Sequence, residues 1–317
     1  MKHERSTQGK SPEPPSPDAY RPIEQLIPDH WRQEIVVANG IRQQIHRTGG
    51  DKPPMVLLHG FMESGLTWLR MAKTLEADYD VILVDARAHG RSDRPETPLT
   101  PELLAEDAAA LIETLTLQQP ILFGRSNGAV TAVLVALAQP TLARALILEE
   151  PPLGGMPRPN VQPDGAQGGG NWFEAWLSWL RGLRQQPHLE RIASSAARWP
   201  HGIPVLPDEP VWPEEEFVPW VEALAQFDTT VFRRKISFWS LLPYVGQLAQ
   251  IPAPILLMGG NPEYGSLVPE GAEEAAEWRG RTVVRFARAG HLVSRGRSFG
   301  GCLAAVQRFL REQTPPQ

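Results

Sequence analysis

The stretch Pro120–Gly128 constrains the fold of this chain more than any other part of its sequence. An apolar run of strand type leads into Gly-Arg-Ser-Asn-Gly at residues 124–128, and an Ala-rich apolar segment of helical type follows to about residue 138. A serine at a sharp turn between strand and helix is lifted above a sheet, and the flanking glycines avoid collisions that side chains would cause. The stretch therefore predicts Ser126 as a nucleophile.

A second copy of the Gly-x-Ser-x-Gly pattern occurs at residues 296–300. The residues before it, His291 to Arg295, do not form an apolar strand. We interpret this copy as a loop that opens the last helix, with Ser298 available as its N-cap. The context of the pattern, and not the pattern itself, selects Ser126.

Segments of strand type alternate with segments of helical type on both sides of Ser126. An Asn39-Gly40 turn predicts a hairpin at the start of the alternation, because both of its turn positions require positive φ. Further apolar segments have the length of buried strands: residues 54–58, 79–85, 144–149, 254–258 and 282–286. The alternation predicts an α/β fold, with a mostly parallel sheet covered by helices on both faces.

The composition divides the chain into three parts. Residues 151–250 are rich in Pro, Gly and Trp and lack the regular alternation, so we expect an inserted, mainly helical cap. The core is then expected from residues 31–150 and 251–317. Residues 1–30 begin with a polar, Pro-rich stretch without the apolar run of a signal peptide, and we expect a disordered leader.

Charge and cysteine content limit the partners and the compartment. The net charge of −5 offers no basic surface for nucleic acid, and no apolar run is long enough to cross a membrane. The single cysteine, Cys302, cannot form an internal disulfide. The histidines lack the spacing of metal ligands, so we expect no metal. These features favour a cytoplasmic protein, a monomer or a homodimer.

Four motifs in order resemble those of the α/β-hydrolase superfamily. They are His59-Gly60-Phe61, the loop at residues 85–93, the elbow around Ser126, and Ala289-Gly290-His291 before a helix. The resemblance covers roughly residues 34–150 and 254–310. It implies the α/β-hydrolase fold, a cofactor-free serine hydrolase and a chain order of serine, acid and histidine, in which His291 is the base.

The acid of this triad is open between two glutamates. Glu263 follows the strand at 254–258, where the common family pattern has an aspartate. Glu150 ends the strand after the elbow helix, and its position is similar to that of the acid in haloalkane dehalogenases and zearalenone-lactone hydrolases. Alternation along that strand points Glu149 and Glu150 to opposite sides. We favour Glu150 and keep Glu263 as the alternative.

The resemblance also implies an oxyanion hole formed by the backbone amides of Phe61 and Asn127. Phe61 follows His59-Gly60, and Asn127 follows the nucleophile at the start of a helix. Backbone amides at that position suit a tetrahedral intermediate, because they are unpaired and the helix dipole favours negative charge.

Tryptophan is concentrated in the expected cap, which holds seven of the ten in the chain. Trp172, Trp176 and Trp179 are spaced to form one stripe of a helix. The stripe either packs the cap onto the core or lines an apolar pocket above Ser126, and the two roles are compatible. With Trp172 and Trp176 as pocket residues, we expect a small hydrophobic or aromatic ester or a lactone as substrate.

Two other functions remain open on the sequence. The same triad serves carbon–carbon bond hydrolases of the meta-cleavage-product type, and a capped pocket could serve a ligand receptor without hydrolysis. The intact Ser126 and His291 weigh against the receptor. Epoxide hydrolases and dehalogenases of this fold need a carboxylate nucleophile, and Ser126 argues against both.

Overall fold

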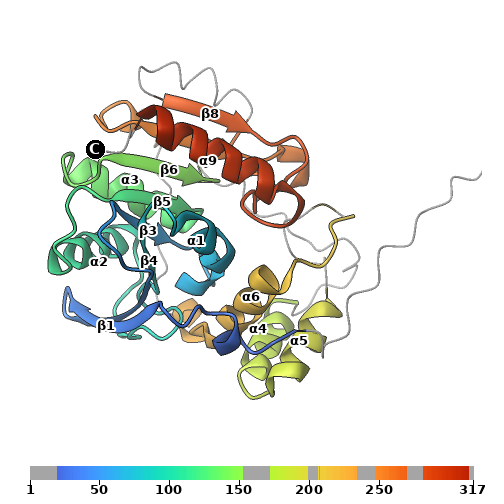
Figure 1. The fold of residues 1–317 in the computed structure, drawn as a ribbon. Coiled ribbons are helices and arrows are strands. Elements are labelled where there is room, and N and C mark those ends of the chain that lie inside the picture. Colours follow the sequence, from blue (N-terminus) through green and yellow to red (C-terminus); the bar gives the residue numbers. More distant parts are fainter. Residues whose placement is uncertain are drawn as a thin grey trace, which may run out of the picture.

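The computed structural model describes residues 20–152, 172–198, 206, 208–233, 247–269 and 281–313, without the side chains of residues 172–174, 233 and 281. Its centre is an eight-stranded sheet in the order β1-β2-β4-β3-β5-β6-β7-β8 (Figure 1). The strands are β1 (Arg32–Ala38), β2 (Ile41–Arg47), β3 (Pro54–Leu58), β4 (Asp80–Val84), β5 (Ile121–Arg125), β6 (Ala145–Glu149), β7 (Ile255–Gly259) and β8 (Arg281–Arg285).

The predicted hairpin forms the first edge of this sheet. β1 and β2 pair antiparallel around Asn39 and Gly40, whose φ angles are 48° and 72°. β2 also pairs antiparallel with β4, and β3 to β8 run parallel. The expected α/β fold with a mostly parallel sheet is confirmed.

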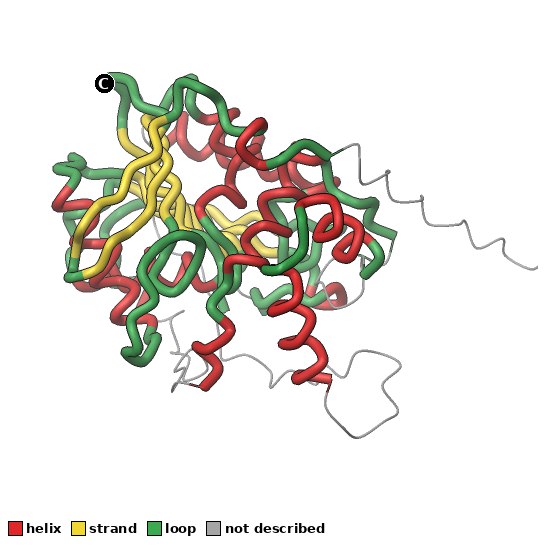
Figure 2. Tube along the Cα trace, turned by 90° about the horizontal axis from the view of Figure 1, so that it is seen from below, coloured by secondary structure: helices red, strands yellow, loops and turns green. Residues whose placement is uncertain are grey.

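Helices cover both faces of the sheet (Figure 2). Strand alternation sends Met55 and Leu57 to one face and Val56 and Leu58 to the other, and all four side chains are buried. The first face is covered by α1 (Leu69–Leu75) and α9 (Phe299–Gln313), and the second by α2 (Pro101–Thr114) and α3 (Asn127–Ala138). Burial on both faces explains why the central strands read as continuous apolar runs.

The described part of residues 151–250 contains α4 (Trp172–Leu183), α5 (His188–Ala196) and α6 (Glu214–Gln226). Figure 1 shows these helices grouped together outside the sheet. Phe217 of α6 is fully buried in the cluster that covers the first face of the sheet, and α6 packs against α1. The insertion is therefore attached to the core through a shared apolar cluster.

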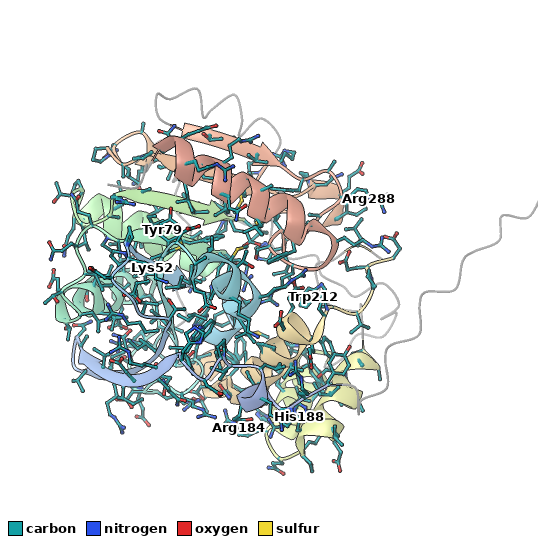
Figure 3. The ribbon with its side chains drawn as sticks, viewed as in Figure 1. Lys52, Tyr79, Arg184, His188, Trp212 and Arg288 are labelled. Carbon is teal, nitrogen blue, oxygen red and sulfur yellow. The ribbon has the colours of Figure 1, made fainter. Side chains whose placement is uncertain are left out.

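The expected boundary of the leader at residue 30 differs from the structure. Tyr20, Ile23 and Leu26 are buried in the cluster that also contains α1 and α6. The Tyr20 carbonyl lies 3.2 Å from Nε2 of His188, the first residue of α5, which is labelled in Figure 3. Residues 20–30 therefore belong with the folded part, because three apolar side chains find a common site there. Residues 1–19 lie outside the described residues.

Ser126 stands in the strained turn that the sequence predicts. Its φ and ψ are 51° and −116°, and it directly precedes α3. A Cβ atom added at Gly128 would lie 2.1 Å from the Leu58 carbonyl oxygen, and one at Gly124 would lie 2.3 Å from the Gly128 carbonyl oxygen. The elbow therefore packs backbone against backbone on β3. The second copy of the pattern instead forms a 3-10 turn, Gly296–Ser298, before α9.

We expect Gly128→Ala to lower the free energy of unfolding by about 3 kcal/mol, because the added methyl group meets main-chain atoms that cannot rotate away. Gly182→Ala in α4 is the matched control, since an added Cβ there has nothing within 4 Å. It should be neutral or stabilising by about 0.5 kcal/mol. Urea denaturation measures both changes, and equal stability of the two variants would contradict the close packing at the elbow.

Candidate active site

The parallel strands bring the predicted residues to one edge of the sheet. His59 and Gly60 follow β3, Ser126 follows β5, Glu150 follows β6, and His291 lies in the loop after β8. In parallel sheets ligands bind outside the carboxyl ends of the strands. Residues that are far apart in the sequence therefore share the edge where a site is expected.

Glu150 is fully buried and lies against His291. Its Oε2 atom is 3.2 Å from His291 Nδ1 and accepts a hydrogen bond of 2.6 Å from the Leu267 amide. Its Oε1 atom accepts hydrogen bonds from the Gly260 amide and the Ser266 hydroxyl. The donors orient the carboxylate, and the contact with Nδ1 leaves Nε2 as the imidazole atom available to a nucleophile.

Glu263, the alternative acid, is exposed in the 3-10 turn Pro262–Tyr264. Its amide donates a 2.9 Å hydrogen bond to Asn261 Oδ1, which caps that turn. The Asn261 amide in turn bonds to the Ala289 carbonyl at 2.8 Å. This segment thus holds the His291 loop in place through its backbone, while Glu150 makes the carboxylate contact with His291.

Ser126 is half-buried at the start of α3, and its amide donates to the Glu149 carbonyl at 2.8 Å. The hydrogen bonds of the described residues include none between the Ser126 hydroxyl and the His291 imidazole. Catalytic hydrogen bonds are often long without substrate and tighten in the complex. The geometry joins the candidate acid to the candidate base directly and brings the serine to the same edge.

The predicted oxyanion residues flank the serine. A Cβ atom added at Gly60 would lie 3.5 Å from the Ser126 Cβ, so the loop that continues into Phe61 passes beside the nucleophile. Asn127 is the first residue of α3, where amides lack an intrahelical partner. The loop that leads into Phe61 and the first residue of α3 therefore both lie next to Ser126.

Aromatic rings connect the insertion with this loop. The ring of Trp176 is 5.9 Å from that of Phe232, and Phe232 is 5.9 Å from Phe61 in an edge-to-face arrangement. Phe227 contacts both Phe61 and Phe232. Trp176 therefore belongs to an aromatic cluster that reaches the loop beside Ser126. The side chain of Trp172 lies outside the described residues.

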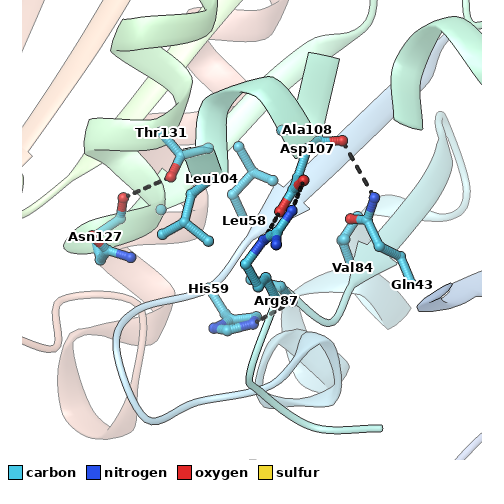
Figure 4. Close-up of a pocket in the computed structure, with 12 residues that line it drawn as sticks. Gln43, Leu58, His59, Val84, Arg87, Leu104, Asp107, Ala108, Asn127 and Thr131 are labelled. Atoms are coloured by element: carbon cyan, nitrogen blue, oxygen red, sulfur yellow. Dashed lines mark hydrogen bonds and ion pairs between the residues drawn. The ribbon is translucent and has the colours of Figure 1, made fainter. Parts of the chain in front are cut away.

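A cavity of about 20 Å³ lies behind the site, between His59, Asn127 and the Arg87–Asp107 ion pair (Figure 4). That volume is enough for about one water molecule and too small for a substrate. The ion pair, at 2.6 Å, fastens the loop after β4 to α2, and the Ala86 amide in that loop donates to His59 Nε2 at 3.0 Å. The sequence motif around Arg87 is therefore a structural support of the site.

The described residues provide neither a metal site nor a membrane-spanning helix. They contain no group of three or more His, Cys, Asp or Glu side chains arranged to hold a metal ion. None of their helices combines the length and the hydropathy that a membrane-spanning helix needs.

A family model described as alpha/beta hydrolase fold matches residues 53–294. The match covers β3 to β8, the elbow around Ser126 and His291, which together define the site above. The chain belongs to the α/β-hydrolase family.

Individual proteins resemble this chain either over part of its length or at low sequence identity. A 2-(acetamidomethylene)succinate hydrolase from Mesorhizobium japonicum is 36% identical over 122 residues, which are 38% of this chain and 44% of that protein. The match thus spans less than half of that relative. An N-formylmaleamic acid deformylase from Pseudomonas putida has a TM-score of 0.67 at 22% identity, over 87% of this chain and 100% of the other. A Bacillus subtilis carboxylesterase has a TM-score of 0.65 at 20% identity, over 90% and 93%.

His89 is a buried histidine at the back of the site that the sequence analysis leaves without a role. It is fully buried, its Nδ1 atom lies 2.8 Å from the Arg87 carbonyl, and its Nε2 atom has no partner among the described residues. Burial, reinforced by the neighbouring His59, lowers the pKa of His89 to about 3 from an ordinary 6.5. The folded protein therefore holds this imidazole neutral where the unfolded chain protonates it.

The depressed pKa of His89 predicts a loss of stability as the pH falls below 6.5 towards 3. In that range only the unfolded state takes up this proton, at about 1.4 kcal/mol per pH unit. His89→Gln should remove this contribution, so its unfolding free energy should fall less steeply than that of the wild type. Urea denaturation between pH 7 and about pH 4.5 measures the difference, and parallel curves would contradict a neutral buried His89.

Proposed function

We propose that this protein is a serine hydrolase that cleaves a hydrophobic or aromatic carboxylic ester or a lactone through an acyl-enzyme. The observation that carries the proposal is the 3.2 Å contact between Glu150 and His291, at the sheet edge where Ser126 stands in its strained turn. A buried carboxylate on Nδ1 orients an imidazole so that Nε2 accepts the proton of a serine.

In the proposed mechanism, the Ser126 oxygen attacks the substrate carbonyl while its proton passes to His291 Nε2. Glu150 stabilises the resulting imidazolium, and the amides of Phe61 and Asn127 stabilise the oxyanion. Collapse of this intermediate breaks the ester bond, and His291 returns the proton to the leaving alcohol. Water then attacks the acyl-enzyme with His291 again as base, which releases the acid and restores Ser126.

The aromatic cluster supports the proposed substrate class. Phe61, Phe227, Phe232 and Trp176 approach one another beside the loop that carries the proposed oxyanion amide. Aromatic side chains favour an apolar or aromatic acyl group over a sugar or a charged peptide. Proteins of similar fold include a carboxylesterase and an enzyme that degrades an N-acyl homoserine lactone.

Hydrolysis of an N-acyl bond is the second candidate. It is favoured by the similarity to two relatives, a 2-(acetamidomethylene)succinate hydrolase and an N-formylmaleamate deformylase, with 36% and 32% identity over parts of the chain. The same triad and oxyanion hole would serve, with an amine as the leaving group. The substrate panel below therefore includes an anilide.

We expect the wild type to hydrolyse p-nitrophenyl esters from acetate to decanoate, with an optimum that reports the length of the acyl pocket. Ser126→Ala should lower kcat by about a millionfold, since loss of the nucleophile removes the acyl-enzyme route. p-Nitroacetanilide tests the N-acyl alternative. A folded wild type that cleaves none of these compounds, or a Ser126→Ala variant that stays active, would contradict the proposal.

Glu150→Gln and Glu263→Gln form a matched pair, because each removes one carboxylate charge and keeps the size of the side chain. We expect Glu150→Gln to lower kcat by about a thousandfold or more, since the imidazolium loses its partner. Glu263→Gln should stay within about twofold of the wild type, because this side chain is exposed. Steady-state kinetics on the best ester decides, and the reverse pattern would assign Glu263 as the acid.

A further inference from the structure

Buried charged side chains lie next in sequence to the proposed catalytic residues. Arg125 precedes Ser126 and Glu149 precedes Glu150, while Arg295 lies four residues after His291 in the loop that follows β8. Each of these three side chains is at most 2% exposed. Burying a charge costs free energy unless the charge is paired, so the partners of these side chains indicate their structural role.

Glu63 is the hub of this group. Its Oε2 atom accepts a hydrogen bond of 2.9 Å from the Gly60 amide and bonds of 3.0 and 2.5 Å from Nε and Nη2 of Arg125. Its Oε1 atom accepts a bond of 2.7 Å from Nη2 of Arg295. One carboxylate thus joins the loop after β3, the end of β5 and the loop after β8.

Arg125 ties the same segments together from the elbow. Its Nη1 atom donates to the Ser294 hydroxyl at 3.0 Å, and its guanidinium lies 4.3 Å above the ring of Trp68. Glu149 Oε1 accepts a 2.8 Å bond from the Ser294 amide. The segment after His291 is therefore held from both the elbow strand and the strand that ends beside Glu150.

The charges keep Glu63 ionised. Burial opposes ionisation, but the guanidiniums of Arg125 and Arg295 lower the pKa of Glu63 to about 2. An ionised carboxylate accepts strong hydrogen bonds from several directions, and a paired guanidinium donates them in a fixed plane. Directional hydrogen bonds of this kind set the relative orientation of the three segments, which apolar contacts of the same volume specify less closely.

We propose that Glu63 is a positioning residue that fixes the Gly60–Phe61 backbone, and with it the proposed oxyanion amide, against the elbow and the His291 loop. This inference rests on the proposed serine hydrolase. Glu63 acts through the Gly60 amide and through its two arginine partners. Removing its charge frees the loop that bears the Phe61 amide while Ser126, His291 and Glu150 stay in the chain.

The chain offers a matched control at the amino ends of the parallel strands. Asp80, the first residue of β4, is also buried, pairs with the Arg47 guanidinium at 2.6 Å and accepts a bond of 2.9 Å from the Gly49 amide. Its contacts therefore have the same chemistry as those of Glu63, at a site far from the carboxyl ends of the strands. Asp80→Asn measures the structural cost of losing such a carboxylate without touching the proposed site.

The test compares Glu63→Gln with Asp80→Asn and the wild type in ester kinetics and in hydrogen–deuterium exchange of the peptide that contains Gly60. We expect Glu63→Gln to lower kcat about 10- to 100-fold with KM within about threefold, since oxyanion stabilisation acts in the transition state. Exchange of the Gly60 peptide should be at least 10-fold faster. Asp80→Asn should keep kcat within about twofold and leave that peptide protected.

The possible results distinguish a failure of the positioning role of Glu63 from a failure of the proposed hydrolase function. Equal loss of kcat in both variants, or unchanged kcat and exchange in Glu63→Gln, would overturn the positioning role. A wild type without esterase activity would overturn the proposed function, while the exchange measurement would still decide whether Glu63 holds the loop. If Glu63→Gln does not fold, Arg295→Gln takes its place, because it removes one partner of Glu63 and leaves the Glu63–Arg125 pair. Unchanged kcat and unchanged exchange of the Gly60 peptide in Arg295→Gln would then overturn the positioning role of Glu63.

Discussion

The site depends on the close backbone contact between the elbow and β3. Ser126 is held at a φ of 51°, and Gly128 leaves no room for a side chain against the Leu58 carbonyl. A non-glycine residue in this conformation costs free energy and persists only where the surrounding structure enforces it. Here the pairing of β5 with both β3 and β6 provides that enforcement. The strained serine is thus a product of the centre of the sheet.

The ends of the neighbouring strands position the other proposed catalytic groups. β6 ends at Glu149 and passes directly to the proposed acid Glu150, whose amide bonds to the Met258 carbonyl at the end of β7. The residues after β7 supply two amides and a hydroxyl to the Glu150 carboxylate. Each proposed catalytic group therefore leaves the sheet at a strand end, and the fixed spacing of strands determines the spacing of the groups. The buried charges around Glu63 lie immediately beneath this edge.

Much of this arrangement is predictable because its causes are local. The Asn39-Gly40 turn, the apolar strands and the glycines around Ser126 each express a backbone or burial preference of a few neighbouring residues. The choice between Glu150 and Glu263 depends instead on where the chain goes after β7, which no local preference encodes. The folded part also begins earlier in the chain than the sequence predicts, for a related reason. Tyr20, Ile23 and Leu26 are too few to form a periodic pattern, and their burial depends on surfaces supplied by α1 and α6. Glu63 and Arg295 carry no sequence signal of their own, because 232 residues separate them.

The proposed triad can be tested most directly by covalent labelling. A fluorophosphonate reacts with a serine only where a base activates the hydroxyl and an oxyanion hole receives the phosphoryl oxygen, so labelling does not require knowledge of the natural substrate. Intact mass spectrometry should show a single adduct on the folded protein, and peptide mapping should place it on Ser126. No adduct, or an adduct on another residue with Ser126 unmodified, would contradict the assignment of Ser126, His291 and Glu150 as a catalytic triad.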